Sequence, residues 1–459
     1  MRQCARAGAR PFQAHVAEQW RSAALLHTSG QLHAGEACSA TQQSFIEREN
    51  KYGAHNYAPS PVVLAKAQGV FVWDVDNRPY FDFCSAYSAT NQGHNHPKIV
   101  QALVDQVQTL SLTSRAFYND VLGTYEEHIT KLFGYDKVLP MNTGGEGGET
   151  ACKLARRWGY DVKGVAKNKA VILFPENNFW GRTLSAVSTS TDPTSYGGFG
   201  PYMPGFDIIP YNDLPALEQK LESNPNIVAF MTEPIQGEAG IIVPDDGYLK
   251  GAHALLKKHN ALLIADEVQT GLGRTGRLLT CDYDGVHPDI LVLGKSLSGG
   301  TYPISAVLAN DEVMLTIGRG QHGSTYGGNP LAAKIATAAL QVTVSEELPQ
   351  NSYAMGQLFR QQLSSLQETS ERVTAVRGKG LLNAIVMEPY DGIGANAVCA
   401  KLKDAGLLAK STLTQGDIIR LAPPLIISKE QILECADIIH TTVASFDASL
   451  TADHPVQAA

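Results

Sequence analysis

The sequence predicts an α/β protein built on a mostly parallel central sheet. Five short apolar runs show little alternation between apolar and polar residues, as expected for strands covered on both faces. Stretches with helical spacing of apolar residues separate them, for example residues 214–221 and 248–259. The predicted strands are residues 169–174, 227–232, 261–265, 290–293 and 304–308.

Four of these runs end directly in a polar or glycine-rich loop. Ligands of open α/β sheets bind beyond the carboxyl ends of the strands. We therefore expect the four loops to converge on one crevice and to share a site. They begin, in chain order, at Asn177, Glu233, Asp266 and Gly294.

The composition excludes some classes of function. The chain has 459 residues, of which 44% are hydrophobic and 18% charged, and its formal net charge is −8. An acidic chain without a basic stripe or zinc-spaced Cys/His cluster is not expected to bind nucleic acid or a metal. No apolar run approaches the roughly 18 residues that cross a bilayer, so no membrane partner is expected. The seven cysteines are scattered, which indicates a reducing compartment and ordinary buried thiols, although Cys84 lies close to a candidate substrate tyrosine.

The chain divides into a leader, a large domain and a smaller domain. Residues 1–40 contain four arginines and only two acids, a composition typical of a mitochondrial transit peptide; a leader without an address is the alternative. Residues 85–344 form the expected large domain. The segment 41–84 is expected to pack with the smaller domain, residues 345–447, whose strands are predicted at 378–386 and 417–421. Residues 448–459 are a polar tail.

Two strand-end residues carry the expected chemistry. Lys295 lies between an apolar strand and a Ser/Gly loop, where burial lowers the pKa of an amine and favours the neutral form that attacks an aldehyde. Taken alone, it is more simply interpreted as a lysine whose amine reaches solvent at a strand end. Asp266 also follows an apolar strand directly, where a carboxylate needs a cationic partner or caps the next loop. The protonated ring nitrogen of pyridoxal phosphate is such a partner.

Two glycine-rich loops are suited to a phosphate. Residues 142–148 (NTGGEGG) precede a helical segment, and the N–H groups of a helix start attract anions. Residues 322–329 (HGSTYGGN) add two hydroxyl groups. Phe179 offers an aromatic face for a pyridine ring. Ordinary turns and a core phenylalanine are the simpler interpretations of these features when each is taken alone.

Together these motifs resemble the class III pyridoxal-phosphate-dependent aminotransferases, over residues 45–446. The two most specific motifs are DEVQTGLGRTG from Asp266 and LGKSLSGG around Lys295. Within this family the chain is most similar to the ornithine aminotransferases. The further motifs are KYGAHNY from Lys51, NQGHNHPKI from Asn91, LTSRAFYN from Leu112, NFWGRTLSA from Asn178, EPIQGEAG from Glu233, HGSTYGGN from His322 and GDIIR from Gly416.

The resemblance implies a fold, a cofactor and its ligands. The fold would be of the aspartate-aminotransferase type (fold type I), in a homodimer or higher homo-oligomer with its sites at the interface. Lys295 would be the Schiff-base lysine and proton shuttle, and Asp266 would pair with the ring nitrogen. The remaining cofactor contacts would come from Gln269 on the ring oxygen, Phe179 stacked on the ring, and Gly144, Gly145 and the neighbouring subunit's Thr325 on the phosphate.

The resemblance also implies the substrates, L-ornithine and 2-oxoglutarate, in the mitochondrial matrix. The distal amino group of ornithine would be transferred, giving glutamate 5-semialdehyde and glutamate. Tyr57 and Tyr87 would recognise ornithine, although two core tyrosines are the simpler interpretation. Arg182 and Arg420 would clamp the two carboxylates of 2-oxoglutarate, because a guanidinium group pairs with a carboxylate through two hydrogen bonds. Glu238 would pair with Arg420 while ornithine is bound.

Some positions depart from the family pattern. Glycines stand at Gly145 and Gly147, where the family more often has a β-branched residue and alanine, and we expect weaker cofactor retention. Residues 58–60 are less bulky than usual, and a short insertion lies near residues 413–415. The main alternative is an ω-aminotransferase for N-acetylornithine or 4-aminobutyrate. An alternative of another class is a cofactor-binding regulatory protein that has lost catalysis.

Overall fold

The computed structural model describes residues 39–389, 394–412 and 416–453, with side chains up to residue 447. The predicted leader up to residue 38, the insertion at 413–415 and the end of the tail lie outside the described residues. The described residues divide into two units, the first ending at Gly53 and the second beginning at Ala54. Helix α2 (Ala40–Tyr52) belongs to the first unit and begins where the Ser39 side chain accepts a hydrogen bond from the Gln42 N–H.

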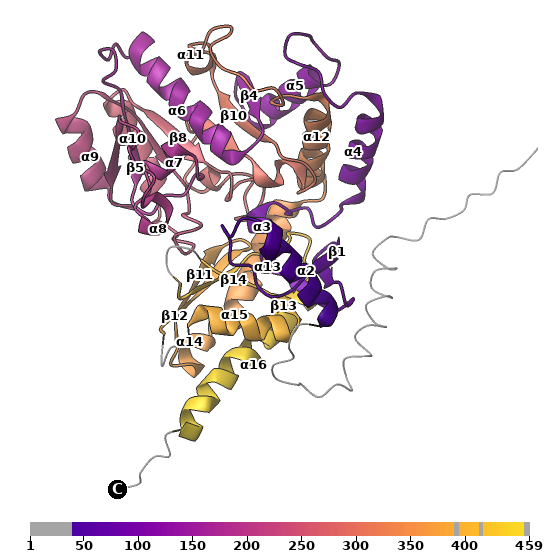
Figure 1. The fold of residues 1–459 in the computed structure, drawn as a ribbon. Helices are drawn as coiled ribbons and strands as arrows, with labels where there is room; N and C mark the ends of the chain where they lie inside the picture. The colour runs from indigo at the N-terminus through magenta and orange to yellow at the C-terminus, as the bar shows by residue number, and fades with distance from the viewer. Residues whose placement is uncertain (1–38, 390–393, 413–415, 454–459) are drawn as a thin grey trace, which may run out of the picture. The chain divides into compact units, whose positions relative to one another are not determined.

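A seven-stranded sheet forms the centre of the second unit (Figure 1). Five neighbouring strands, from β6 to β9, are parallel, and β10 runs antiparallel to both β9 and β4. The predicted strands are all present, with bounds shifted by up to two residues. Two further strands, β4 and β6, were not predicted. In sheet order the seven strands are β4 (Lys137–Met141), β10 (Ser305–Ala309), β9 (Ile290–Leu293), β8 (Leu262–Asp266), β7 (Ile227–Thr232), β5 (Val171–Pro175) and β6 (Phe206–Ile209).

Helices cover both faces of this sheet, which explains why the strand sequences do not alternate. Ile172 and Phe174 pack on the side of α6 (Gly144–Asp161), whereas Leu173 between them packs on the side of α9 (Leu214–Ser223) and α10 (Tyr248–Lys258). The predicted helices at 214–221 and 248–259 are therefore confirmed. Near β10 the core continues onto α5 (Leu122–Phe133) and α12 (Pro330–Ser345), and α12 also contacts α4 (Pro97–Thr109).

Two smaller sheets have four strands each. The first, β1 (Leu64–Gln68), β2 (Phe71–Asp74), β3 (Pro79–Asp82) and β13 (Leu407–Leu408), pairs Phe81 with Leu407 across β3 and β13. A segment before Ser85 thus shares a sheet with one far beyond Val344, as the domain prediction requires; the domain boundaries stay a prediction. The second sheet contains β11 (Val373–Lys379), β12 (Leu382–Met387), β15 (Ile418–Leu421) and β14 (Lys410–Ser411).

The prediction of one strand at 378–386 is wrong. The chain reverses at Gly380, and β11 and β12 form an antiparallel pair. Gly380 has φ +56°, and a Cβ atom there would lie 2.2 Å from the backbone carbon of Thr275, so only glycine fits this turn. The predicted strand at 417–421 is confirmed as β15.

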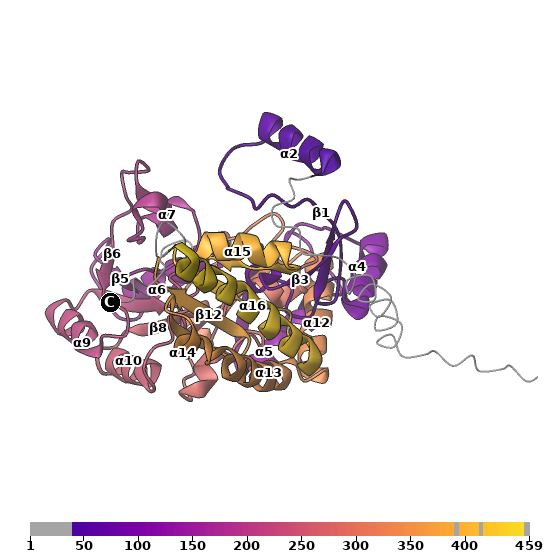
Figure 2. The same cartoon turned by 90° about the horizontal axis from the view of Figure 1, so that it is seen from below.

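Helices cover the second small sheet, and Figure 2 shows α15 and α16 side by side. None of the helices in the described ranges is both long and apolar enough to span a membrane. The helices around the second small sheet are α13 (Leu348–Leu363), α14 (Leu366–Thr369), α15 (Ala395–Asp404) and α16 (Lys429–Asp453). The short helices elsewhere in the unit are α3 (Ser85–Ser88), α7 (Leu184–Val187), α8 (Pro193–Tyr196) and α11 (Asp311–Met314). Two 3-10 turns, η1 (Thr280–Tyr283) and η2 (Lys295–Ser298), follow β8 and β9.

Candidate active site

The four predicted loops meet at the carboxyl edge of the large sheet. The Phe179 N–H donates to Glu233 Oε1 at 3.2 Å, which joins the loops after β5 and β7. Gln269 Nε2 lies 3.5 Å from Glu238 Oε1, which joins the loops after β8 and β7. Lys295, in the loop after β9, lies close enough to Asp266 and Glu233 for its charge to lower the pKa of both carboxyl groups, which brings in the fourth loop. The predicted convergence is confirmed.

Lys295 is the first residue of η2, directly after β9. Its backbone has φ +47°, a left-handed conformation that costs a non-glycine residue about 1–3 kcal/mol and is often found at functional sites. Burial lowers the pKa of its amine, and the nearby Glu238 opposes this shift. Lys295 thus has the environment of a lysine that is readily deprotonated.

Asp266 is the last residue of β8, and only 6% of it is exposed. Burial raises the pKa of its carboxyl group to about 6, while the Val268 N–H, 3.0 Å from Oδ1, and the nearby Lys295 charge lower it. A carboxylate in this position gains from a cationic partner. The ring nitrogen of pyridoxal phosphate is chemically suited to that role.

Glu233, which the sequence places at the start of the second loop without a predicted role, is another buried ionisable residue. Burial raises the pKa of its carboxyl group to about 8, and the nearby Asp266 adds to the shift. Its Oε1 accepts the Phe179 N–H, and its Oε2 accepts the Gly237 N–H at 3.0 Å. Glu233 directly follows the buried strand β7, much as Asp266 ends β8, and this shared pattern could have identified it.

The start of α6 presents two backbone donors. The Thr143 side chain accepts from the Glu146 N–H at 3.2 Å, and Glu146 Oε2 accepts from the Thr143 N–H at 3.0 Å. The N–H groups of Gly144 and Gly145 come next and have no partner within the helix. They are suited to phosphate oxygens, as predicted.

The loop from His322 to Asn329 is tied to the same helix. His322 Nε2 lies 2.8 Å from Thr150 Oγ1, and Lys153 Nζ lies 2.9 Å from His322 Nδ1. Asn142 donates to Ser324 Oγ at 2.8 Å. Thr325, the predicted phosphate ligand of a neighbouring subunit, is exposed.

Glu238 and Arg420 form a buried ion pair. Arg420, on β15, is 2% exposed, and its Nη2 atom lies 2.6 Å from Glu238 Oε1. Other polar atoms here are buried without a partner among the described residues: Arg420 Nε and Nη1, Glu238 Oε2 and Gln269 Oε1. Such atoms are costly unless a ligand satisfies them. They point to a polar ligand bound between β15 and the large sheet.

Tyr87 and Tyr57 lie near this pair. The Arg420 guanidinium lies 4.8 Å from the centre of the Tyr87 ring. Burial raises the pKa of the Tyr87 hydroxyl, and the nearby Cys84, Glu238 and Tyr57 add to the shift. Tyr57 itself is 72% exposed, so it is not the core tyrosine of the simpler interpretation.

Arg182 and Phe179 belong to the loop after β5. Arg182 is exposed, and its guanidinium lies 5.7 Å from the centre of the Phe179 ring. An exposed arginine beside this ring is suited to pair with a distal carboxylate. Phe179 is half-buried, as a ring that stacks on a ligand must be.

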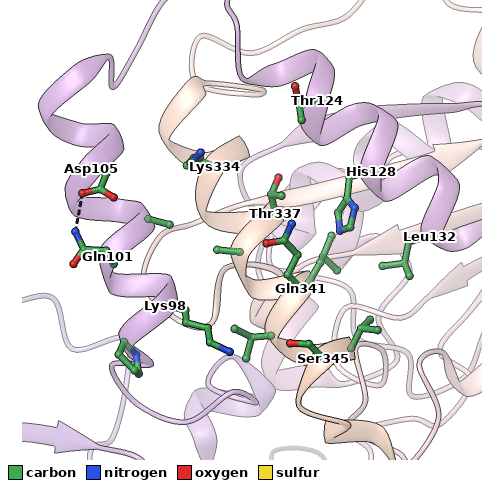
Figure 3. A pocket seen from close by; sticks show the side chains of 16 residues that line it. Lys98, Gln101, Asp105, Thr124, His128, Leu132, Lys334, Thr337, Gln341 and Ser345 are labelled. Atoms are coloured by element: carbon green, nitrogen blue, oxygen red, sulfur yellow. Dashed lines mark hydrogen bonds between the residues drawn. The ribbon is translucent and has the colours of Figure 1, made fainter. Parts of the chain in front are cut away.

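A cavity of about 1150 Å³ lies elsewhere, between α4, α5 and α12 (Figure 3). Its lining includes Lys98, Asp105, His128, Lys334 and Gln341. It contains none of the predicted site residues. We therefore place the active site at the loops beyond the sheet.

The residues at this edge fit pyridoxal phosphate. Asp266 suits the ring nitrogen, and the N–H groups of Gly144 and Gly145 on α6 suit the phosphate. Gln269 Oε1, near Glu238, is buried without a hydrogen-bond partner in the described part of the chain, and a bound ligand could supply one. Residues 52–443 match the family model described as Aminotransferase class-III. The chain belongs to this family and is an aminotransferase that depends on pyridoxal phosphate. Its fold is fold type I, the aspartate-aminotransferase type predicted from the sequence.

Several proteins similar to this chain are ornithine aminotransferases. The mitochondrial ornithine aminotransferase of Rattus norvegicus is 63% identical over 406 residues, 88% of this chain and 91% of the relative. A structure of the Toxoplasma gondii ornithine aminotransferase, with pyridoxal phosphate partially occupying its active site, has a TM-score of 0.87 at 44% identity and covers 96% of this chain and 99% of its own. An acetylornithine aminotransferase from Elizabethkingia anophelis has a TM-score of 0.81 at 54% identity, covering 88% and 99%.

Proposed function

We propose that this chain is an ornithine δ-aminotransferase. It transfers the δ-amino group of L-ornithine to 2-oxoglutarate and produces L-glutamate 5-semialdehyde, which cyclises, and L-glutamate. The observation that carries this proposal is the buried Glu238–Arg420 pair beside Tyr87. Glu238 can either pair with Arg420 or leave it free to bind a carboxylate, with no change in the backbone. A site that accepts a diamino acid and a diacid in turn needs an arginine of this kind.

The residues of the chain divide the chemistry among them. Pyridoxal phosphate, when bound, supplies an electron sink for the carbon from which a proton is removed. Asp266 favours the protonated ring nitrogen, Phe179 covers the ring, and the amides of Gly144 and Gly145 hold the phosphate. The neutral amine of Lys295, favoured by its lowered pKa, removes and returns the proton.

Substrate alternation follows from the ion pair. With ornithine bound, Glu238 neutralises Arg420, and Tyr57 and Tyr87 hold the α-amino-acid end away from the cofactor. With 2-oxoglutarate bound, Arg420 is released to the α-carboxylate and Arg182 takes the distal carboxylate. The buried, unpaired Nε and Nη1 atoms of Arg420 support this role, because a carboxylate would satisfy them.

Replacing Glu238 tests the proposal. Glu238→Ala is expected to slow the ornithine half-reaction by about tenfold or more, the effect of one lost charge-assisted hydrogen bond. The glutamate half-reaction should change little. Both are measured in single turnovers of the holoenzyme, from the change in visible cofactor absorbance. An equal loss in the two half-reactions would contradict the switch.

A second candidate activity is transfer from N-acetylornithine, favoured by the likeness to the Elizabethkingia anophelis structure. An acetylated α-amine would not need the α-amino-acid contacts assigned to Tyr57 and Tyr87. Comparing kcat/KM for ornithine, N-acetylornithine and 4-aminobutyrate decides between them. The proposed function requires ornithine to be preferred, and preference for either other donor would overturn it.

We propose also that the active enzyme is a homodimer in which Thr325 binds the phosphate of the partner's cofactor. The exposure of Thr325 and the anchoring of its loop on α6 support this arrangement. Thr325→Glu and Lys295→Ala should each be inactive alone. Mixed and reassembled, they should regain about a quarter of wild-type activity, because half of the dimers then contain one complete site. Absence of recovery, with mixed dimers shown by mass spectrometry, would contradict it.

The mitochondrial matrix is the proposed location. The relative from Rattus norvegicus is named mitochondrial, and residues 1–40 have the composition of a transit peptide. Residues 1–40 fused to a fluorescent protein should enter mitochondria. A fusion that stays in the cytosol would contradict the proposed address.

A further inference from the structure

Four consecutive residues, Ser85–Ser88, have left-handed backbones. Their φ angles are 48°, 45°, 61° and 73°, and none of them is glycine. Residues with a Cβ atom avoid this region because Cβ approaches the following carbonyl oxygen, and Ser, Ala and Tyr lack the side chains that tolerate it best. The surrounding structure must therefore hold this turn, and its third residue is Tyr87.

The carboxylate of Asp82 holds the start of the turn. Its Oδ1 accepts the N–H groups of Cys84 at 2.9 Å and of Ser85 at 2.8 Å. Its Oδ2 lies 2.7 Å from His94 Nε2. The backbone of His94 is fixed in turn by reciprocal hydrogen bonds with Gly69. Both oxygens of this buried carboxylate therefore have partners: Oδ1 binds the turn, and Oδ2 contacts the imidazole of His94, whose backbone is held in place.

The turn is connected to the substrate pocket at two points. The Tyr87 N–H donates to the Cys84 carbonyl at 2.9 Å, so the segment held by Asp82 sets the position of Tyr87. The Ala422 N–H donates to the Phe83 carbonyl at 2.8 Å, which joins the turn to the strand that carries Arg420. A shift of the turn would therefore move the Tyr87 ring away from Arg420.

We infer that the Asp82–His94 pair is a positioning element for ornithine recognition. It keeps the left-handed turn in place and so holds the Tyr87 ring over Arg420, where it contacts the α-amino-acid end of the donor. Neither Asp82 nor His94 touches the substrate. The inference rests on the proposed function, since it assigns these residues to the ornithine half-reaction and not to the glutamate one.

Variants of the pair test the inference in the holoenzyme. Asp82→Ala removes both acceptors and should raise the apparent Kd for ornithine about tenfold or more, as loss of a charged hydrogen-bond acceptor does. Asp82→Asn keeps one oxygen for the two N–H groups and should have a smaller effect. His94→Gln should weaken ornithine binding in the same way. The rate and apparent Kd of the glutamate half-reaction should change less than about threefold.

Asp74 provides a matched control on the neighbouring strand. It is also buried, its Oδ1 accepts the N–H groups of Asp76 and Arg78, and its Oδ2 accepts from the Tyr80 hydroxyl. This arrangement resembles that of Asp82, but it holds a turn between β2 and β3. Asp74→Asn should therefore not discriminate between the two half-reactions. An ornithine-selective defect in this control would overturn the inference.

A double mutant decides whether Asp82 acts through Tyr87. Adding Asp82→Asn to Tyr87→Ala should weaken ornithine binding little beyond Tyr87→Ala alone. Full additivity, or equal losses in the two half-reactions, would overturn the inference. Should Asp82→Ala fail to fold, Asp82→Asn and His94→Gln still give this result. A wild-type enzyme that does not convert ornithine would overturn the proposed function instead.

Discussion

At the scale of single residues, the site depends on the balance of three ionisable groups. Asp266 and Glu233 are buried and Lys295 is half-buried at adjacent strand ends, and the removal of each group from water shifts its pKa in favour of the neutral form. The cofactor's ring nitrogen would add a cation to this group. The ionisation of Asp266 should therefore differ between the cofactor-free and the loaded protein.

The pH dependence of stability tests this coupling. In the folded chain the pKa of Asp266 is about 6, above its ordinary value of 3.8. The folded state then binds this proton more tightly than the unfolded state, so the contribution to stability is complete below pH 3.8 and falls as pH rises toward 6. The loss is on the order of 3 kcal/mol. In cofactor-free protein, the melting temperature of wild type should decline relative to Asp266→Asn over this window.

Adding pyridoxal phosphate provides the control. A cationic ring nitrogen beside Asp266 favours the carboxylate, so the wild type should then gain stability relative to Asp266→Asn above pH 6. If the melting temperatures of the two proteins changed with pH in the same way, both with and without cofactor, Asp266 would not titrate as described.

At the scale of elements, the start of α6 combines the proposed phosphate site with weak helix formers. Gly145 and Gly147 lie at the beginning of this helix, where alanine would favour the helical conformation more strongly. The space around them differs. A Cβ atom at Gly145 would lie 3.7 Å from its nearest neighbour, a methyl group of Thr183, whereas one at Gly147 would lie 2.9 Å from Val292 Cγ1.

Gly145→Ala should therefore stabilise the protein by up to about 1 kcal/mol and slow the release of pyridoxal phosphate. Gly147→Ala should gain less or nothing, because Val292 must move. Thermal melting and the rate of cofactor loss after dilution measure both effects. A larger gain from Gly147→Ala would show that crowding at Val292 is unimportant.

Much of this architecture could be predicted from the sequence. Apolar runs identified five of the buried strands, and their carboxyl ends led to Lys295 and Asp266. Glu238 was identified from the family resemblance. The hairpin at Gly380 was missed because a glycine between two apolar runs does not reveal the contact with Thr275 that forces the turn. The left-handed turn at Ser85–Ser88 was missed for a related reason: its residues have no local preference for that conformation, which Asp82 and His94 impose through tertiary contacts.

At the scale of the whole molecule, one buried arginine joins the large sheet's loops to the small sheets. Arg274 follows β8 and is fully buried, and its pKa is lowered by that burial to about 9. Its guanidinium donates to the carbonyls of Leu381 and Pro423 and to Asn91 Oδ1. These acceptors come from three distant parts of the sequence.

Arg274→Met should destabilise the protein by about 3–5 kcal/mol, because it leaves three buried acceptors without a donor. The exposed Arg277, three residues along the same loop, provides the control, and Arg277→Met should cost less than about 1 kcal/mol. Urea denaturation followed by tryptophan fluorescence measures both. Equal midpoints for the two variants would show that Arg274 is not the link described.

The capping arrangement of α6 has a consequence for the behaviour of the enzyme in dilute solution. The side chains of Thr143 and Glu146 each accept a hydrogen bond from the other residue's backbone N–H. The N–H groups of Gly144 and Gly145 are therefore the two that remain for a phosphate, which has several oxygens to satisfy. In the proposed dimer, the partner's Thr325 supplies a further donor. Cofactor binding and dimerisation are then coupled, so each favours the other. Saturating pyridoxal phosphate lowers the dissociation constant of the dimer, and dilution below that constant promotes release of the cofactor. Specific activity should therefore depend on enzyme concentration when the cofactor is scarce.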